Sequence, residues 1–268
     1  MRGRILVIGK GLLGKAVARH PQAADIEFLS HGAATDAGIF DGVDCVVNLG
    51  INPAYRSDPY RAEIDFDLHL ASLLGDRPLH YVMVSSRKVY GMGGGMAFAE
   101  DAPLRPIDDY GRNKVRSEAL LSNMLGDRLT VMRISNIVGF DWEWNRAIFF
   151  GLMLDSLRRE DRIVFDVDPK VQRDFITDDA VAGALLWAAR EAPPGVFNLG
   201  SGIPLEIGNI ARWTLEAHGS GELVVTSTRK YDEFVLDVAK LSRCIGPPCT
   251  IELIRRKCFE LGRHIAHA

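Results

Sequence analysis

The chain has 268 residues, and its 32 Lys and Arg against 35 Asp and Glu give a net charge of −3. Apolar residues make up 47% and charged residues 25%, the balance expected of a soluble globular protein. This composition excludes a generally basic nucleic-acid-binding protein, and a chain of this length needs no metal or disulfide for stability. No apolar run reaches the roughly 18 residues of a membrane span. Length alone predicts one large domain, or one domain with a smaller lobe.

Cysteine and histidine usage points to no metal and no disulfide framework. The four cysteines show no CxxC spacing, and the histidines are scattered without ligand spacing, so we expect reduced thiols, no metal site and a cytoplasmic protein. The first apolar run, 5–8, stops at Gly9 and is too short for the core of a signal peptide.

Short apolar segments alternate with helical ones along the first two hundred residues. Strands are predicted over 5–8, 26–29, 44–49, 80–85, 129–134 and 195–199. Helices are predicted over 12–19, 62–74, 110–125 and 178–189. Such alternation is typical of βαβ units, and predicts an α/β fold with a doubly wound parallel sheet covered on both faces.

The pattern changes at two places. The glycine-rich segment 91–96 is predicted to be a flexible loop beside the sheet. After Gly202 the alternation loosens, with helices predicted over 207–217, 240–244 and 251–266, and this region is expected to form a smaller lobe.

A glycine-rich turn follows the first predicted strand. Residues 9–14 read Gly-Lys-Gly-Leu-Leu-Gly, which is GxGxxG placed between a strand and a helix. Glycines at this spacing allow a tight turn and a close approach to a pyrophosphate, and the helix N-terminus supplies N–H groups and a positive dipole. We predict a Rossmann-type dinucleotide site with the contacts Gly9, Gly11, Leu12, Leu13 and Gly14; the alternative is a purely structural turn.

The end of the second predicted strand bears on the choice of dinucleotide. NAD sites normally carry an Asp or Glu there for the ribose 2′-OH. Here the strand ends at Ser30 and His31, while Glu27 sits inside it. Ser30 and His31 can both donate to a 2′-phosphate, so NADP is slightly favoured over NAD.

Further contacts with the dinucleotide are predicted in the next two loops. Asp36 is placed to accept a hydrogen bond from the adenine amino group, or else is an ordinary loop or capping residue. Leu49 and Gly50 end the third strand, where the backbone can pass close to the cofactor.

Tyr110 and Lys114 have the YxxxK spacing on a predicted helix. Residues four apart share one helix face, which brings the ammonium to about 5 Å from the phenol. The pKa of a free tyrosine is near 10, and a cation ~5 Å away at an effective dielectric of ~20 favours phenolate by ~3 kcal/mol, or ~2 pKa units. A tyrosine tuned in this way can protonate a developing alkoxide or take the proton back.

Two serines precede this helix at the end of the fourth predicted strand. Ser85 and Ser86 lie at the carboxyl edge of the sheet, where ligands bind in open α/β folds. A serine hydroxyl there can hydrogen-bond a carbonyl or hydroxyl oxygen next to Tyr110.

Taken together, these motifs resemble the extended short-chain dehydrogenase/reductases, in the NAD(P)-dependent nucleotide-sugar epimerase/dehydratase/reductase group. The resemblance runs from about residue 5 to 202. The matching segments are the turn at 9–14, Asn48-Leu49-Gly50, Ser85-Ser86 with Val89-Tyr90-Gly91, Glu100-Asp101 with Pro103 and Pro106, Tyr110-Gly111 with Lys114 and Glu118, Arg133 with Asn136 and Gly139, Arg173-Asp174-Phe175-Ile176 with Asp178-Asp179, and Asn198-Leu199-Gly200-Ser201-Gly202.

The resemblance implies roles for individual residues. Ser86, Tyr110 and Lys114 match a catalytic triad, whose lysine also holds the nicotinamide ribose. Asn136 and Arg173 match positions that hold the substrate diphosphate, a role that suits the rigid guanidinium fork. The alternatives are an Asn that ends a strand and an Arg paired with Asp174. Dimerisation through two helices, one matching 110–125, is a further implication.

The sequence departs from the family pattern at two points. The first position of the family's glycine turn is Ile8, and Gly9 supplies the alternative spacing. The 4,6-dehydratases carry Asp-Glu directly after the catalytic hydroxyl residue, where this chain has Arg87 and Lys88. A dehydratase is therefore not expected. The basic pair is predicted to bind an anionic substrate, or else is two solvated charges on a loop.

These observations lead to one expected function and two alternatives. We expect an NAD(P)-dependent oxidoreductase that reduces a keto group of a nucleotide-activated sugar: Tyr110 delivers the proton, Ser86 polarises the carbonyl and Lys114 tunes the tyrosine. An epimerase would use the same residues, and a non-catalytic dinucleotide-binding sensor is a third possibility. The expected partner is a small molecule, with no nucleic acid and no membrane.

The motifs also divide the chain. Residues 1–202 are predicted to form the NAD(P)-binding domain, with an inserted substrate-lobe segment at about 140–175. Residues 203–268 are predicted to form a small C-terminal substrate-binding lobe.

Overall fold

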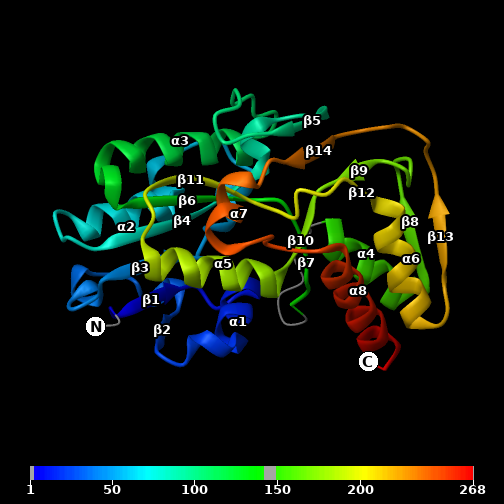
Figure 1. Cartoon of the computed structure of the whole chain (residues 1–268), viewed down its shortest axis with the longest axis horizontal. Helices are drawn as coiled ribbons and strands as arrows, with labels where there is room; N and C mark the ends of the chain where they lie inside the picture. The colour runs from blue at the N-terminus through cyan, green and yellow to red at the C-terminus, as the bar shows by residue number, and fades with distance from the viewer. Residues whose placement is uncertain (1–2, 142–148, 268) are drawn as a thin grey trace.

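The computed structural model describes residues 3–141 and 149–267. Its centre is a six-stranded parallel sheet with the order β11-β6-β4-β3-β1-β2 (Figure 1). The strands are β1 (Ile5–Ile8), β2 (Ile26–Leu29), β3 (Cys45–Asn48), β4 (His80–Ser86), β6 (Leu129–Ile134) and β11 (Gly195–Leu199). No helix within the described ranges is long and apolar enough to cross a membrane.

Helices cover both faces of this sheet. Figure 1 shows α2 (Phe66–Leu74) and α3 (Asp109–Leu125) on one side, with α1 (Leu12–Arg19) and α5 (Asp178–Glu191) on the other. Alternate residues of each strand pack on opposite helix layers; in β1, Val7 belongs to one apolar cluster and Ile8 to the other. Because both faces of the inner strands are buried, these strands are mostly apolar, as in Ile5–Ile8 of β1. The predicted doubly wound α/β fold is confirmed.

The remaining elements form smaller sheets and further helices. The two-stranded sheets pair β10 (Phe175–Thr177) with β7 (Asn136–Val138), and β13 (Glu222–Val225) with β8 (Arg162–Phe165). A further sheet has the order β12 (Leu205–Glu206), β9 (Gln172–Arg173), β14 (Glu233–Leu236) and β5 (Gly94–Phe98). The helices are α4 (Phe149–Glu160), α6 (Ile207–His218), α7 (Ala239–Ile245) and α8 (Ile251–Ala266). Elements α4, α6, α8, β8 and β13 lie together at one end of the molecule, whereas α7 lies beside the central sheet (Figure 1).

The C-terminal third of the chain does not lie entirely apart from the central sheet. Helix α8 packs on α6 and also contacts β10, while α7 packs against β11 at the edge of the sheet. The domain boundaries at 202 and at about 140–175 remain predictions, and residues 142–148 of the inserted segment lie outside the described residues.

The glycine-rich segment near residue 94 differs from the sequence prediction. Residues 94–96, expected to be part of a flexible loop, begin strand β5. Its partner β14 runs parallel to it and comes from about 140 residues further along the chain, with Glu233 opposite Gly94 and Leu236 opposite Phe98. The loop prediction is wrong here because the pairing that fixes the backbone is supplied by this distant segment.

Candidate active site

A cavity of about 600 Å³ opens at the carboxyl edge of the central sheet. Most of the predicted site residues line it: Gly11, Leu12, Leu13, Gly14, Leu49, Gly50, Ser86, Arg87, Lys88, Tyr110, Lys114, Asn136 and Arg173. Ser30, His31 and Asp36, which follow β2, and Gly9 lie outside this lining. The parallel sheet explains why the glycine turn, Leu49-Gly50 and Ser86 converge, because its strands all end at one edge.

A larger hollow of about 1020 Å³ lies elsewhere, against α5 and α8. None of the predicted triad residues lines it. Its buried cation, Lys257, is ion-paired with Asp179 of the same wall (2.5 Å) and with the buried Asp178 (2.9 Å). Although this hollow is larger, we assign the candidate active site to the smaller cavity, because Ser86, Tyr110 and Lys114 line the smaller one.

The glycines of the turn allow β1, α1 and the loop after β3 to pack closely together. Gly9 has φ +115°, and a Cβ atom there would lie 2.8 Å from the Gly50 nitrogen. A Cβ on Gly14 would lie 2.1 Å from the Gly9 carbonyl oxygen, so α1 packs closely on the end of β1. Helix α1 begins after Gly11, and no side chain of the described residues caps its first N–H groups. This cradle fits a pyrophosphate.

The only carboxylate within β2, that of Glu27, is bound by a neighbouring guanidinium. Both oxygens of Glu27 accept hydrogen bonds from the Arg4 guanidinium, each at 2.7 Å. Ser30 and His31 are exposed beyond the strand, and the His31 ring lies 4.2 Å from that of Phe66.

Asp36 occupies a capping position in the structure. Its Oδ1 accepts a hydrogen bond from the Gly38 backbone N–H at 2.8 Å, at the start of the short 3-10 turn over 37–40. A contact between Asp36 and adenine remains a prediction.

The two serines at the end of β4 have different partners. Ser85 is buried and donates a short hydrogen bond to the Glu118 carboxylate. Ser86 is half-buried at the cavity, and its oxygen accepts a hydrogen bond from the Lys88 backbone N–H at 3.3 Å. In this contact Ser86 is the acceptor, so the contact does not use the hydroxyl proton. That proton can be donated to a ligand in the cavity.

The start of α3 sets the positions of Tyr110 and Lys114. Asp108 caps the helix by accepting a hydrogen bond from the Gly111 N–H at 2.8 Å, so Tyr110 lies in the first turn and Lys114 one turn later. Tyr110 is half-buried, and its ring lies edge-on to that of Tyr55 with 6.3 Å between centroids. The Arg56 guanidinium lies 5.3 Å from the Tyr110 ring centroid.

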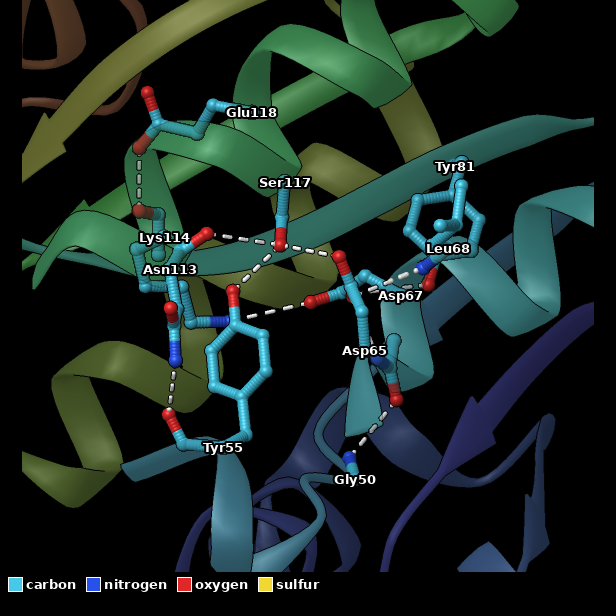
Figure 2. A network of polar contacts seen from close by, with 12 residues as sticks. Gly50, Tyr55, Asp65, Asp67, Leu68, Tyr81, Asn113, Lys114, Ser117 and Glu118 are labelled. Carbon is cyan, nitrogen blue, oxygen red and sulfur yellow. Dashed lines mark hydrogen bonds and ion pairs between the residues drawn. The ribbon is translucent and has the colours of Figure 1, made fainter. Parts of the chain in front are cut away.

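Lys114 is buried against a carboxylate, as Figure 2 shows. Its Nζ lies 3.2 Å from Asp67 Oδ2 and 5.2 Å from the Tyr55 ring centroid. Burial lowers the pKa of the ammonium, but Asp67 and the phenol of Tyr110 raise it by more, so the pKa of Lys114 is raised overall. The lysine therefore remains a cation at neutral pH.

The basic pair after Ser86 is split between the interior and the surface. Lys88 is exposed and ion-paired with Asp108. Arg87 is only 8% exposed, makes a two-point ion pair with Asp232, and stacks 3.9 Å from the Phe234 ring centroid. The alternative of two solvated charges is therefore wrong for Arg87.

Arg173 is buried at the opposite wall of the cavity. It donates from Nε to the Asp232 carbonyl oxygen (3.1 Å) and from Nη2 to the Tyr231 carbonyl oxygen (3.0 Å). The Asp174 carboxylate is instead surrounded by donors from Ser135, Ser201, Gly202 and Leu236. The alternative pairing of Arg173 with Asp174 is wrong.

Asn136 is the first residue of β7, directly opposite Phe175 of β10. It lines the cavity, and its side-chain Nδ2 is buried with no hydrogen-bond partner among the described residues. A buried amide donor without a partner is costly, so its position at a cavity favours a ligand oxygen as its acceptor.

The cavity is positively charged although the chain as a whole is acidic. The charged side chains in the described lining are Arg56, Arg87, Lys88, Lys114 and Arg173 against Asp108 and Asp232. This excess of cations favours an anionic ligand.

Several residues at the site were not predicted. Among them are Arg56 in the loop after β3, and Tyr231 and Asp232 in the segment before β14, which line the cavity. Asp67 in α2 lies outside the lining and contacts Lys114. Asp67 carried one signal, a carboxylate in the first turn of a helix, but that pattern is ordinary for helix starts. No sequence pattern around Tyr231 or Asp232 predicts that this segment lies at the cavity.

Comparison with solved structures shows the same fold over the whole chain. UDP-N-acetylglucosamine 4-epimerase from Methanobrevibacter ruminantium, in complex with UDP-N-acetylmuramic acid, is 18% identical with a TM-score of 0.82 and full coverage of both chains (100% each). UDP-glucose 4-epimerase from Thermus thermophilus, in complex with NAD, is 18% identical with a TM-score of 0.78, covering 97% of this chain and 99% of that one. RMD from Pseudomonas aeruginosa, complexed with NADPH, is 21% identical with a TM-score of 0.75 and covers the same shares, 97% and 99%.

A family model adds sequence evidence to this structural likeness. It matches residues 5–200, which include the glycine turn, Ser86, Tyr110, Lys114 and Arg173. The chain therefore belongs to the NAD dependent epimerase/dehydratase family, enzymes of the extended short-chain dehydrogenase/reductase type.

Proposed function

We propose that this enzyme reduces a keto group on a nucleotide-activated sugar, with NADPH as its preferred reductant. The observation that carries the proposal is the convergence of Ser86, Tyr110 and Lys114 with the glycine turn on one cavity. A dinucleotide held by that turn supplies a hydride from C4 of its nicotinamide. The protein then has to orient the ketone and provide one proton.

The side chains at the cavity suit these two tasks. Ser86 donates a hydrogen bond to the carbonyl oxygen and polarises the bond, which favours the arrival of a hydride at the carbon. Tyr110 gives its phenolic proton to the oxygen as it becomes an alkoxide. Lys114, buried and charged, stabilises the phenolate that remains.

The substrate class follows from the charge of the cavity. Arg173 and Asn136 present a guanidinium fork and an unpaired amide donor at the same cavity, which suits a diphosphate. Arg87, buried one residue beyond Ser86, lines the same cavity, with its charge paired to Asp232. The solved structure from M. ruminantium contains a UDP-sugar, which supports a ligand of this class.

The choice of NADPH rests on the tip of β2. Ser30 and His31 are exposed there and can donate to a 2′-phosphate, while Glu27 is held by Arg4. NADPH is bound in the P. aeruginosa relative and NAD in the T. thermophilus relative, so the fold accommodates both.

Epimerisation is the second candidate, because two structural relatives are epimerases. The same Tyr110 would then accept a proton from the sugar hydroxyl and return it after re-reduction of the opposite face. A tightly retained dinucleotide with no net consumption would distinguish this reaction.

The test follows absorbance at 340 nm with a panel of UDP- and dTDP-linked 4-keto sugars and 4-hydroxy sugars. Stoichiometric oxidation of NADPH by a keto sugar is the expected result. Interconversion of 4-hydroxy epimers without consumption of NAD(P)H would replace the reductase with the epimerase.

A further inference from the structure

Asp67 lies at the centre of the buried network behind the cavity (Figure 2). It is 4% exposed in the first turn of α2. Its Oδ2 lies 3.2 Å from Lys114 Nζ, and its Oδ1 accepts hydrogen bonds from Asn48 Nδ2 (2.7 Å) and the Tyr81 hydroxyl (3.0 Å). Three donors therefore surround this one carboxylate.

The same carboxylate connects the lysine to the cofactor edge of the sheet. Asn48 donates to Asp67 and, through its Oδ1, accepts a hydrogen bond from the Gly50 backbone N–H at 2.9 Å. Gly50 lines the cavity beside the glycine turn. Asp67 therefore fixes the position of Lys114 relative to the loop on which the dinucleotide is expected to lie.

Other charged or titratable groups face the lysine from the neighbouring elements. They are Tyr55 from the loop after β3, Asp65 directly before α2, and Tyr110 on α3. Glu118 is ion-paired with Arg133 at 2.7 Å. Asp65 is hydrogen-bonded to the Ser117 and Tyr60 hydroxyls and to the Leu68 N–H.

The direct counter-ion of Lys114 is therefore Asp67. An ammonium buried as deeply as this one loses its proton readily unless an anion faces it. Asp67 stands in direct contact, whereas the carboxylate of Asp65 is directed to Ser117, as Figure 2 shows.

We propose that Asp67 is a positioning residue for the reaction: it keeps Lys114 protonated and held beside Tyr110. The proposal rests on the proposed function of the Tyr110–Lys114 pair. The negative charge of Asp67 opposes loss of the proton from Lys114. The proposed reduction needs Lys114 protonated, so this charge extends activity to higher pH.

The test compares two isosteric variants that each remove one buried carboxylate. Asp67→Asn is expected to move the alkaline limb of the kcat/KM profile for NADPH-dependent reduction down by at least one pH unit. At pH 8 kcat should fall about tenfold or more, and should recover as the pH is lowered, with little change in the KM for NADPH. Asp65→Asn, the matched control, should leave the limb within a few tenths of a unit.

Asp67→Glu provides a second control, because it keeps the charge while moving it. Its kcat is expected to fall but its alkaline limb to remain near that of the wild type. An unmoved limb in Asp67→Asn, or equal shifts in Asp67→Asn and Asp65→Asn, would overturn the proposal. If Asp67→Asn alone does not fold, recovery of the thermal midpoint in Asp67→Asn/Lys114→Met supports the ion pair, and failure to recover overturns it.

Failure of the inference and failure of the proposed function give different results. If Tyr110→Phe is inactive while Asp67→Asn has an unshifted profile, only the inference fails. If Tyr110→Phe keeps full activity, the proposed function fails, and the positioning role of Asp67 is overturned with it.

Discussion

The guanidinium of Arg87 and the carboxylate of Asp232 form a two-point ion pair between residues 145 positions apart. Arg87 directly follows Ser86 at the end of β4, and Asp232 precedes β14 in a left-handed backbone conformation with φ +57°. Because Phe234 also lies under the guanidinium, this pair ties the catalytic loop to the C-terminal part of the chain.

Removing Asp232 should destabilise the protein strongly. Asp232→Ala leaves the Arg87 cation buried without its partner, and we expect a loss of about 3–5 kcal/mol in the free energy of unfolding. Urea denaturation measures this value. The exposed pair of Lys88 and Asp108 gives the comparison: Lys88→Ala should cost no more than ~1 kcal/mol. A loss below ~1 kcal/mol in Asp232→Ala would show that the pair contributes little.

Arg173 should determine substrate affinity. Arg173→Lys keeps the charge but removes the planar fork, so we expect KM for the nucleotide sugar to rise roughly 10- to 100-fold, with a smaller change in kcat. Steady-state kinetics at varied concentrations of the keto sugar measure KM and kcat separately. Arg112→Ala serves as the control, since this exposed cation is paired with Asp109 outside the cavity lining, and it should change KM less than about twofold. A similar KM in Arg173→Lys and the wild type would remove Arg173 from the substrate site.

A carboxylate at the tip of β2 should reverse the dinucleotide preference. Ser30→Asp places a negative charge where a 2′-phosphate would lie, and should weaken NADPH binding about tenfold or more while affecting NADH little. Fluorescence titration with each reduced dinucleotide measures the two dissociation constants. Equal weakening of both, or of neither, contradicts a 2′-phosphate at Ser30.

The parts of the fold that sequence predicts best are those set by local pattern. The strands Leu129–Ile134 and Gly195–Leu199 and the helix Ile251–Ala266 have the predicted bounds. Because parallel strands end at one edge of a sheet, the glycine turn and Ser86 could be placed at the same edge from the sequence. The assignment of Arg173 came from the family resemblance, since Arg173 lies in β9, outside the central sheet.

The parts that sequence does not predict depend on contacts between distant segments. The glycine-rich residues at 94–96 form a strand only because β14 lies beside them. Likewise Arg87 and Lys88 are adjacent and chemically alike, yet one is buried by Asp232 and Phe234 while the other faces solvent. Local propensity carries no information about such partners.

His80 should make stability depend on pH. It is 8% exposed, and its Nε2 lies 2.7 Å from the Thr130 hydroxyl, which itself donates to the Pro193 carbonyl oxygen. Burial lowers the pKa of His80 in the folded state. Below about pH 6.5 the unfolded chain therefore takes up a proton that the folded chain does not, so this contribution to stability is complete above that pH and is lost as the pH falls.

His80 is expected to contribute at most about 1.4 kcal/mol per pH unit to the slope of the free energy of unfolding against pH, at pH values below its ordinary pKa. Urea denaturation between about pH 5 and 7.5 measures it. His80→Gln should reduce the slope, whereas the exposed His267→Gln should leave it unchanged. An identical slope in His80→Gln and the wild type would assign the pH dependence to other groups.

The most direct test of the proposed chemistry is single-turnover oxidation of NADPH by a nucleotide-linked 4-keto sugar, followed at 340 nm in the wild type and in Tyr110→Phe. Because Tyr110 supplies the proton, we predict that the variant binds NADPH with unchanged affinity but transfers hydride about 10²- to 10⁴-fold more slowly. Hydride transfer at the wild-type rate in Tyr110→Phe would contradict the assignment of this cavity as the site of carbonyl reduction.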